Sequence, residues 1–253
     1  MSPSRASIGT LEWAHRGGGR LSRSDRLRVV VEAMLVRLNA LLRASQQVPI
    51  SVDLASLRVP DSALCHSASE LLASVSEAWL VNHCFRTFLW AAILGKKEQR
   101  RFDEELLFVA SALHDLGLTD AAAQLGVTGV ECFAVEGAFA AEHFLTRQGV
   151  EKSRRDVVAE AISLHMNVRA SLAHGVEAYL LHEGAALDVV GARCRDIAEP
   201  TRQELLTSYP RLEMKSRLVT LMKRQSSIRP HSRAGLLCRY GFISMIRRAP
   251  FES

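Results

Sequence analysis

Helix-forming segments follow one another from residue 67 to residue 191 and leave little room for strands. Apolar residues recur in them at intervals of three and four, the period of a helix with one buried face. Gly95, Gly117, Gly149 and Gly191 interrupt the series in the way typical of helix ends. Aromatic residues make up only 6% of the chain, while Ala, Leu and Val are plentiful, which favours helices packed on helices. We predict an all-α fold built from the segments 67–97, 103–117, 134–149, 153–167 and 174–191.

The rest of the chain divides into extensions on either side of one domain. Gly17, Gly18 and Gly19 stand among Ser and Arg residues, which is typical of a flexible segment. A first amphipathic helix follows, with Ser24 as its N-cap. We therefore expect a flexible N-terminal segment, a single helical domain and a basic C-terminal tail, over residues 1–24, 25–225 (core about 75–195) and 226–253.

The net charge of +5 is carried by the two ends of the chain. Residues 1–30 have a net charge of +4, residues 31–210 one of −7, and residues 211–253 one of +8. A basic tail can bind phosphate-rich partners. In "RLEMKSRLVTLMKRQ", however, Leu, Met and Val alternate with the cations at helical spacing, which is typical of a solvated helix face. Nucleic acid is therefore not expected as a partner.

The cysteines indicate a reducing compartment, and the hydropathy pattern argues against a membrane-spanning segment. Five cysteines are widely spread and form no C-x-x-C pair, as is usual for reduced thiols of a cytosolic protein. No apolar run approaches the roughly 18 to 20 residues that span a bilayer, and the first residues contain no continuous apolar stretch. We expect a cytoplasmic protein with a small-molecule substrate and no membrane association. A homo-oligomer is an option that the sequence leaves open.

Imidazole and carboxylate side chains stand in an ordered series on the helical segments. His83 lies in "VNHCFRTFLW", His114 and Asp115 follow the apolar run "LLFVASAL", and Asp188 lies in "GAALDVVG". The intervals of 31 and 73 residues are too long for one local motif and match ligands presented by separate helices of a bundle. Nitrogen and oxygen ligands suit Zn, Fe, Mn or Co. The series therefore predicts a metal site.

The adjacent pair His114 and Asp115 requires a helix end. Neighbouring residues of a helix project about 100° apart, so both can reach one ion only where the helix stops, and Gly117 suggests that it stops there. The competing interpretation is a hydrogen-bonded core histidine and a chance dipeptide. Against it, an unpaired carboxylate at Asp188, among apolar residues, is costly to bury, and a cation would compensate its charge.

The order of these residues resembles the HD-domain superfamily of metal-dependent phosphohydrolases and related enzymes. The local sequence is similar to the branch that includes cyanamide hydratases, over about residues 75–225, in the motifs "NHCFRTFLWAAIL", "SALHDLGLTD", "FAVEGAFAAEHFL", "EAISLHMN", "LLHEGAALDVVG" and "YPRLEMKSRLV". The resemblance implies an HD-domain helical bundle that binds one divalent metal ion, with zinc as the first expectation and iron, manganese or cobalt as alternatives. The implied ligands are His83, His114, Asp115 and Asp188.

The resemblance also implies roles for side chains near these ligands. His165 in "AISLHMN" falls where related proteins place a pocket histidine, and we expect it to contact substrate or to support a ligand; the alternative is a structural histidine near a helix end. Arg86 lies one turn beyond His83 on the same helix face. It is expected to contact substrate or to pair with an acidic neighbour.

Two departures from the branch are visible in the sequence. The branch often has Phe-Glu-Val before a Gly-Ala pair, whereas Ala134 occupies the glutamate position here, and Glu136 is a weak substitute as a substrate-binding carboxylate. His143, His174 and His182 are candidates for a second metal site of the dinuclear type. Their local sequence matches that type poorly, so one ion is the primary expectation.

Metal chemistry at this site predicts a hydrolase or hydro-lyase. A divalent ion open to solvent lowers the pKa of bound water, Asp115 is expected to orient that water, and His165 to move protons. We expect hydration or hydrolysis of a small molecule such as a nitrile, as in cyanamide hydratases.

The alternatives are an HD-type phosphohydrolase acting on a nucleotide or other phosphoester, and a degenerate HD domain serving as a binding or scaffold module. No Gly-rich phosphate loop or tight Lys/Arg cluster flanks the ligands, which favours the small substrate.

Overall fold

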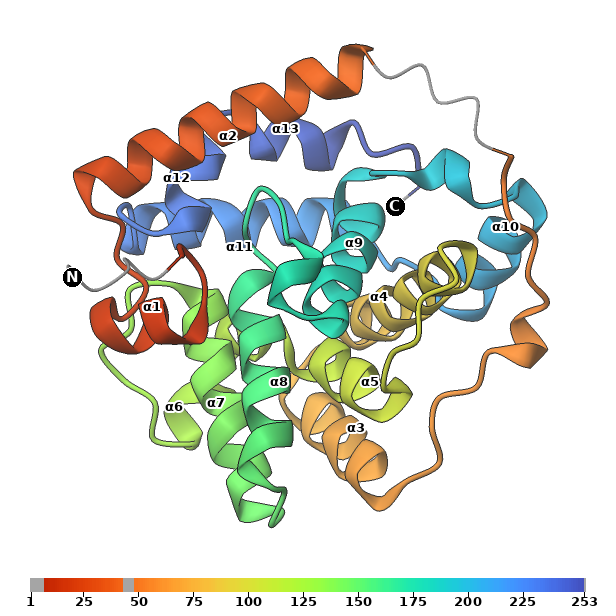
Figure 1. Cartoon of the computed structure of the whole chain (residues 1–253), viewed down its shortest axis with the longest axis horizontal. Helices are drawn as coiled ribbons and strands as arrows, with labels where there is room; N and C mark the ends of the chain where they lie inside the picture. The colour runs from red at the N-terminus through yellow and green to blue at the C-terminus, as the bar shows by residue number, and fades with distance from the viewer. Residues whose placement is uncertain (1–6, 43–47, 253) are drawn as a thin grey trace.

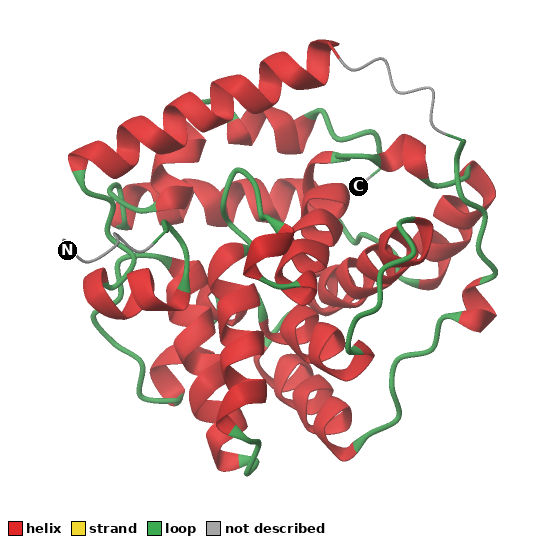
Figure 2. Ribbon diagram, viewed as in Figure 1, coloured by secondary structure: helices red, strands yellow, loops and turns green. Residues whose placement is uncertain are grey.

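Helices account for nearly all the regular structure of the protein. The computed structural model describes residues 7–42 and 48–252, and Figures 1 and 2 show these residues as packed helices joined by loops. Within them, the nearest approach to a sheet is an isolated bridge between Ile50 and Ile197. The all-α prediction is confirmed. None of the helices in the described ranges has the length and apolar character needed to cross a membrane.

The α-helices are numbered in chain order. They are α1 (Leu11–Gly17), α2 (Arg23–Leu42), α3 (Ala63–Val75), α4 (Ala78–Lys97), α5 (Glu104–Leu113), α6 (Ala121–Gln124), α7 (Phe133–Arg147), α8 (Lys152–Leu164), α9 (Val176–Val190), α10 (Glu199–Ser208), α11 (Met214–Ile228), α12 (Arg233–Arg239) and α13 (Phe242–Arg247). Short 3-10 turns lie between them: η1 (Leu54–Ser56), η2 (Leu116–Leu118), η3 (Leu172–His174) and η4 (Cys194–Asp196).

Helix α4 forms the centre of the fold and is buried almost all round. Between Trp79 and Gly95 it has apolar side chains on every face, and a helix of this kind needs neighbours on every side. It packs most extensively on α9 and also contacts α3, α5 and α11. Figure 1 shows α4 and α9 crossing in the middle of the molecule, with α5 and α8 beside them. Gly95, expected at a helix end, instead lies inside α4 and packs against Phe102.

The two ends of the chain form a second layer, seen at the top of Figure 1 as α2, α11, α12 and α13. Trp13, Leu21 and Val29 from the N-terminal end join Met214 and residues of α11 to α13 in one buried cluster. The structure thus has helices in the segment predicted to be flexible and in the predicted basic tail. Residues 7–24 contain α1 with a Thr10 N-cap, residues 233–247 contain α12 and α13, and residues 1–6 lie outside the described range. These helices have too few turns for their periodicity to be recognised in the sequence.

A glycine sets the distance between α4 and α9. Gly184 in α9 lies against the backbone of α4, where an added Cβ would lie 2.3 Å from the carbonyl oxygen of Thr87 and 3.0 Å from the Cβ of Ala91. Only a residue without a side chain permits this approach. Asp188 follows one turn later in α9 and is therefore brought against α4 by the same contact.

Gly184→Ala is expected to destabilise the protein by about 1–3 kcal/mol, because the added methyl group forces the two central helices apart. Gly17→Ala is the matched control, since a Cβ at Gly17 would meet no atom within 4 Å. Urea denaturation followed by far-ultraviolet circular dichroism measures both free energies of unfolding. Equal stabilities of the two variants would contradict a close contact at Gly184.

A single arginine ties the ends of α4 and α9 to the chain that follows. Arg193 donates through Nη1 to Glu98 at 2.8 Å and to Glu183 at 2.9 Å, and through Nε to Asp196 at 2.8 Å. Burial would raise the pKa of Glu98, but hydrogen bonds from Tyr179 and Arg193 outweigh burial and hold that pKa below its ordinary value. Glu98 therefore contributes stability as an anion.

Acid is expected to remove this contribution. A carboxyl group whose pKa falls on folding stabilises the protein above its unfolded pKa, and the effect is lost as the pH falls through the folded pKa. Arg193→Ala should therefore cost about 1 kcal/mol at neutral pH, given the partial exposure of the pair. The part of this cost that comes from Glu98 should shrink as the pH falls below 4.5. Thermal unfolding of the wild type and of Arg193→Ala across the acid range measures this cost. In a Glu98→Gln background the carboxyl group is gone, so the part of the pH dependence that comes from Glu98 should be absent.

Candidate metal centre

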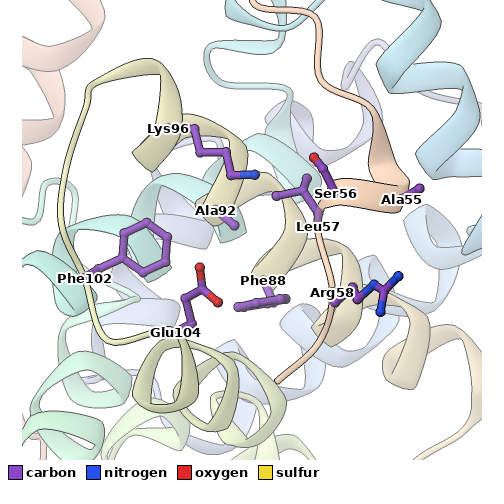
Figure 3. A pocket seen from close by; sticks show the side chains of 9 residues that line it. All are labelled: Ala55, Ser56, Leu57, Arg58, Phe88, Ala92, Lys96, Phe102 and Glu104. Carbon is purple, nitrogen blue, oxygen red and sulfur yellow. The ribbon is translucent and has the colours of Figure 1, made fainter. Parts of the chain in front are cut away.

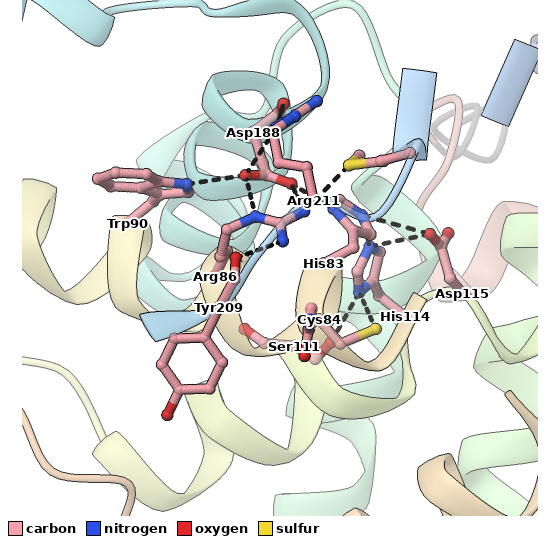
Figure 4. A network of polar contacts seen from close by, with 12 residues as sticks. His83, Cys84, Arg86, Trp90, Ser111, His114, Asp115, Asp188, Tyr209 and Arg211 are labelled. Atoms are coloured by element: carbon pink, nitrogen blue, oxygen red, sulfur yellow. Dashed lines mark hydrogen bonds and ion pairs between the residues drawn. The ribbon is translucent and has the colours of Figure 1, made fainter. Parts of the chain in front are cut away.

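Five side chains from four helices meet inside the bundle. His83 comes from α4, His114 and Asp115 from the end of α5, His165 from the end of α8, and Asp188 from α9. Figure 4 shows His83, His114 and Asp115 facing one another, with Asp188 on the opposite side of the His83 ring. All five are buried. The helical packing thus brings together residues separated by up to 105 positions.

The end of α5 explains how two adjacent residues share one site. Helix α5 ends at Leu113, His114 is its C-cap, and Asp115 has left helical backbone with φ −104° and ψ 13°. The chain turns through η2, where Gly117 approaches α7 so closely that a Cβ would lie 2.0 Å from the carbonyl oxygen of Phe133. The helix end predicted before Gly117 is present, and it lets both side chains face the same space.

Three potential ligand atoms lie at the spacing of a metal coordination shell. The Nε2 atoms of His83 and His114 are 3.2 Å apart, and Oδ2 of Asp115 lies 3.4 Å from the first and 3.3 Å from the second. Tetrahedral bonds of about 2.0–2.1 Å place neighbouring ligand atoms about 3.3 Å apart. Nε2 of His165 lies 3.7 Å from Oδ1 of Asp115. Within residues 7–42 and 48–252, this trio is the one group of His, Cys, Asp and Glu side chains with ligand atoms so disposed.

The other nitrogen of each imidazole is already bound to an acceptor. Nδ1 of His114 lies 2.7 Å from the carbonyl oxygen of Ser111. Nδ1 of His165 lies 2.6 Å from the carbonyl oxygen of Ile162. A carbonyl oxygen only accepts, so Nδ1 carries the proton and Nε2 of the neutral ring has a free lone pair. Nδ1 of His83 donates to Oδ2 of Asp188 at 2.7 Å. Bonds of this kind orient the histidine ligands of protein metal sites.

The residues of the centre fit a divalent metal ion. With Nδ1 as the protonated atom, the lone pairs of His83 and His114 point at one another and at the Asp115 carboxylate, at 3.2–3.4 Å. With neutral rings this arrangement is repulsive in a buried place, unless a cation lies between the atoms or Nε2 of His83 carries a further proton. Two imidazole nitrogens and a carboxylate oxygen are a donor set used for divalent transition metals. His83, His114 and Asp115 could therefore hold such an ion.

The protonation states of His114, His165 and Asp115 agree with metal binding, whereas an ion at His83 would have to displace a proton. Burial lowers the pKa of His114, and burial together with the neighbouring His114 lowers the pKa of His165 to about 3. Burial alone would raise the pKa of Asp115, but His114, His83 and His165 hold it far below its ordinary range. Burial also opposes protonation of His83, yet the Asp115 and Asp188 carboxylates raise its pKa overall. At neutral pH the centre thus offers neutral rings at His114 and His165 and an ionised carboxylate.

Asp188 lies beside His83 and outside the trio, and its predicted role as a fourth metal ligand stays a prediction. Arg86 donates through Nε to Oδ1 at 2.8 Å and through Nη2 to Oδ2 at 2.9 Å. Trp90 Nε1 donates to Oδ1 at 2.9 Å, and Arg211 Nη1 lies 3.4 Å from the same oxygen. Burial would raise the pKa of Asp188, but Arg86 and His83 hold it well below its ordinary value. Both oxygens of this anion thus accept hydrogen bonds, and one of them accepts from His83.

Arg86 and Glu136, which were predicted to contact substrate, are engaged with other groups of the protein. Arg86 is fully buried, and its Nη1 donates to the carbonyl oxygens of Tyr209 and Pro210 at 2.9 and 3.2 Å. Every nitrogen of its guanidinium is therefore engaged, and the acidic neighbour considered from the sequence is Asp188. Glu136 pairs with Arg229 at 2.6 Å. Its carboxylate is thereby tied to the C-terminal end of α11.

The histidines considered for a second ion are dispersed. His143 donates through Nδ1 to the carbonyl oxygen of Leu125 on the surface, His174 lies in η3, and His182 donates to the carbonyl oxygen of His165 at 3.1 Å. None of them joins a metal-binding group within the described ranges. His182 instead supports the backbone of His165.

Trp90 and Arg211 were missed from the sequence. Trp90 shares one face of α4 with His83 and Arg86, because the three residues follow at intervals of three and four. This spacing could have placed Trp90 next to the centre. Arg211 comes from the loop before α11, and no local pattern connects it to Asp188.

A hollow of about 220 Å³ lies on another face of α4, as Figure 3 shows. Phe88, Ala92 and Lys96 of α4 line it together with residues around η1. These three residues lie about half a turn around the helix from His83, and none of the candidate ligands lines the hollow. It is therefore separate from the metal centre.

Comparison with known proteins agrees with this arrangement. The family model of the HD domain matches residues 80–219, more than half of the chain and the part that contains all five side chains of the centre. The cyanamide hydratases DDI2 and DDI3 of Saccharomyces cerevisiae are each 24% identical to the chain over 173 residues, covering 68% of this chain and 76% of each relative. The chain belongs to the HD-domain family and, within it, resembles the cyanamide hydratases.

Proposed function

We propose that the chain is a metal-dependent hydratase that adds water to the carbon–nitrogen triple bond of a small molecule of the cyanamide class. The observation that carries the proposal is the convergence of Nε2 of His83, Nε2 of His114 and the ionised Asp115, at 3.2–3.4 Å, in a buried place. Zinc is the proposed ion, because the spacing of His83, His114 and Asp115 matches tetrahedral nitrogen and oxygen coordination.

The side chains of the centre divide the work of such a reaction. A bound zinc ion supplies Lewis acidity, which makes water nucleophilic near neutral pH. Asp115 Oδ1, the carboxylate oxygen outside the trio, and Nε2 of His165 face one another at 3.7 Å. Both are acceptors at neutral pH and can orient the protons of water or substrate. In a hydration, the water oxygen bonds to carbon and both protons end on the substrate, so no leaving group has to be protonated.

A small, uncharged substrate fits the surroundings of the centre. His83, His114 and Asp115 have side chains only 1%, 1% and 7% exposed, which leaves little access for a nucleotide. A phosphate group also needs free cations. Arg86, the cation next to His83, has all its nitrogens engaged, and Arg229 is paired with Glu136. Arg211 has two nitrogens without a partner, but its guanidinium is bound to Asp188 and not to the trio.

The proposal extends to the compartment. All five cysteines are free thiols, and Cys65, Cys84 and Cys132 are buried, which suits a reducing cytoplasm. Association into a homo-oligomer stays a prediction from the sequence.

The zinc-loaded protein is expected to convert cyanamide to urea and to leave a panel of nucleotides and phosphoesters unchanged. His114→Ala should lower kcat by a factor of about 100 or more, because it removes a ligand and with it the activated water. His143→Ala is the matched control, since His143 lies on the surface outside the centre. Turnover of nucleotides without turnover of cyanamide would replace the hydratase by a phosphohydrolase.

Protein purified without chelator is expected to contain one divalent ion per chain, and chelation should lower its melting temperature. Ligand linkage predicts a stabilisation of about 2.7 kcal/mol at a free zinc concentration 100 times the Kd. Asp115→Asn should abolish the zinc-dependent part of the stability. Metal-free protein whose stability is insensitive to zinc would instead support the scaffold alternative. Elemental analysis and thermal unfolding make these measurements.

A further inference from the structure

We propose that Phe251 is a positioning residue of the metal centre. Its ring contacts Trp90 and Arg211, the two side chains that join Arg86 in donating to Oδ1 of Asp188, and through Asp188 it fixes the orientation of His83. The inference rests on the proposed function, because it concerns the ion that His83 would bind.

One aromatic ring contacts both donors. The rings of Phe251 and Trp90 are stacked with an interplanar angle of 11° and centroids 6.4 Å apart. The guanidinium carbon of Arg211 lies 5.2 Å from the centre of the same Phe251 ring. Trp90 and Arg211 come from α4 and from the loop before α11, so the ring of Phe251 sets their positions relative to each other.

Arg211 depends on this ring more than an ordinary surface arginine would. It is 5% exposed, and its Nη1 donates to the carbonyl oxygen of Asp188 at 3.0 Å. Its Nε and Nη2 atoms are buried without a hydrogen-bond partner among the described residues. The face of an aromatic ring attracts a guanidinium, most strongly where water is excluded. Phe251 thus offsets part of the cost of burying this cation.

The contacts reach His83 through the two oxygens of one carboxylate. Oδ1 of Asp188 accepts from Trp90 at 2.9 Å and from Arg211 at 3.4 Å, while Oδ2 accepts from Nδ1 of His83 at 2.7 Å. Without the ring, Trp90 and Arg211 gain freedom, and Arg86 alone fixes the plane of the carboxylate. The acceptor that orients His83 then becomes less well defined, and outer partners of this kind control metal affinity.

The segment that carries Phe251 is built into the fold. Ala249 and Phe251 are buried, and Lys215 donates to the carbonyl oxygen of Ala249 at 2.8 Å. Pro250 packs on Gly191, where a Cβ would lie 2.2 Å from the proline Cδ. Residues 249 and 250, which directly precede the ring, are therefore anchored in the fold, although they belong to the predicted basic C-terminal tail.

The test measures metal affinity in the full-length chain. Zinc Kd values are obtained by competition with a chromogenic chelator, and the visible spectrum of the cobalt-substituted protein reports ligand geometry. Phe251→Ala is expected to raise the Kd by a factor of about 10 or more and to alter the cobalt spectrum. Phe251→Tyr keeps the ring and should restore both to wild-type values. Where Phe251→Ala fails to accumulate, Phe251→Leu removes the ring but keeps an apolar side chain of similar size, and a raised Kd is again expected.

Ile246→Ala is the matched control. Ile246 is a buried residue of α13, five positions before Phe251. It packs in a cluster that the chain ends share with the starts of α4 and α7, whereas Phe251 belongs to the other core cluster. Ile246→Ala should lower the melting temperature while leaving the Kd within about twofold of wild type. Equal Kd values for Phe251→Ala and Ile246→Ala would overturn the role of Phe251 and leave the proposed function standing. Wild-type protein that binds no zinc would overturn the proposed function itself.

Discussion

The buried pair of Arg86 and Asp188 is the interaction on which the rest of the structure depends. It joins α4 to α9 by two hydrogen bonds between fully buried groups. Taking two charges out of water is expensive, and removing one partner of such a pair typically costs about 3–5 kcal/mol. Apolar residues could replace the pair without loss of stability, but they would leave His83 without an acceptor. The pair therefore serves to place His83 more than to hold the helices together.

The charges around this pair determine what the centre can stabilise. Arg86 and Arg211 formally balance Asp188 and Asp115, so these four buried charges cancel. A divalent cation held there would leave the centre positive, and negative charge that develops beside it would be stabilised in a place with little water. The three Nδ1 bonds keep the imidazoles oriented while this happens. Such preorganisation costs no rearrangement during a reaction.

The sequence was informative where a signal is local and poor where it depends on tertiary contacts. The helical period predicted the all-α fold, and the end of α5 at His114 followed from the neighbouring Gly117. The contacts of the Asp188 carboxylate could not be predicted, because donors such as Arg211 and Trp90 reach it from elements distant in the chain. Nothing local distinguishes a carboxylate that binds a metal ion from one that orients a histidine.

The replacement of a glutamate by Ala134 bears on the type of reaction. Ala134 is fully buried beside Phe133, whose ring packs on His165, and the nearby Glu136 is tied to Arg229. Asp115 and His165 are thus the groups placed to transfer protons. The pKa of Asp115 is strongly lowered and that of His165 is about 3, so both are acceptors at neutral pH. Hydrolysis of a phosphoester generally needs an acid for its leaving group. Addition of water to a nitrile has no leaving group, and a proton that Asp115 or His165 accepts from the water can pass on to the nitrogen, so hydration needs no separate acid.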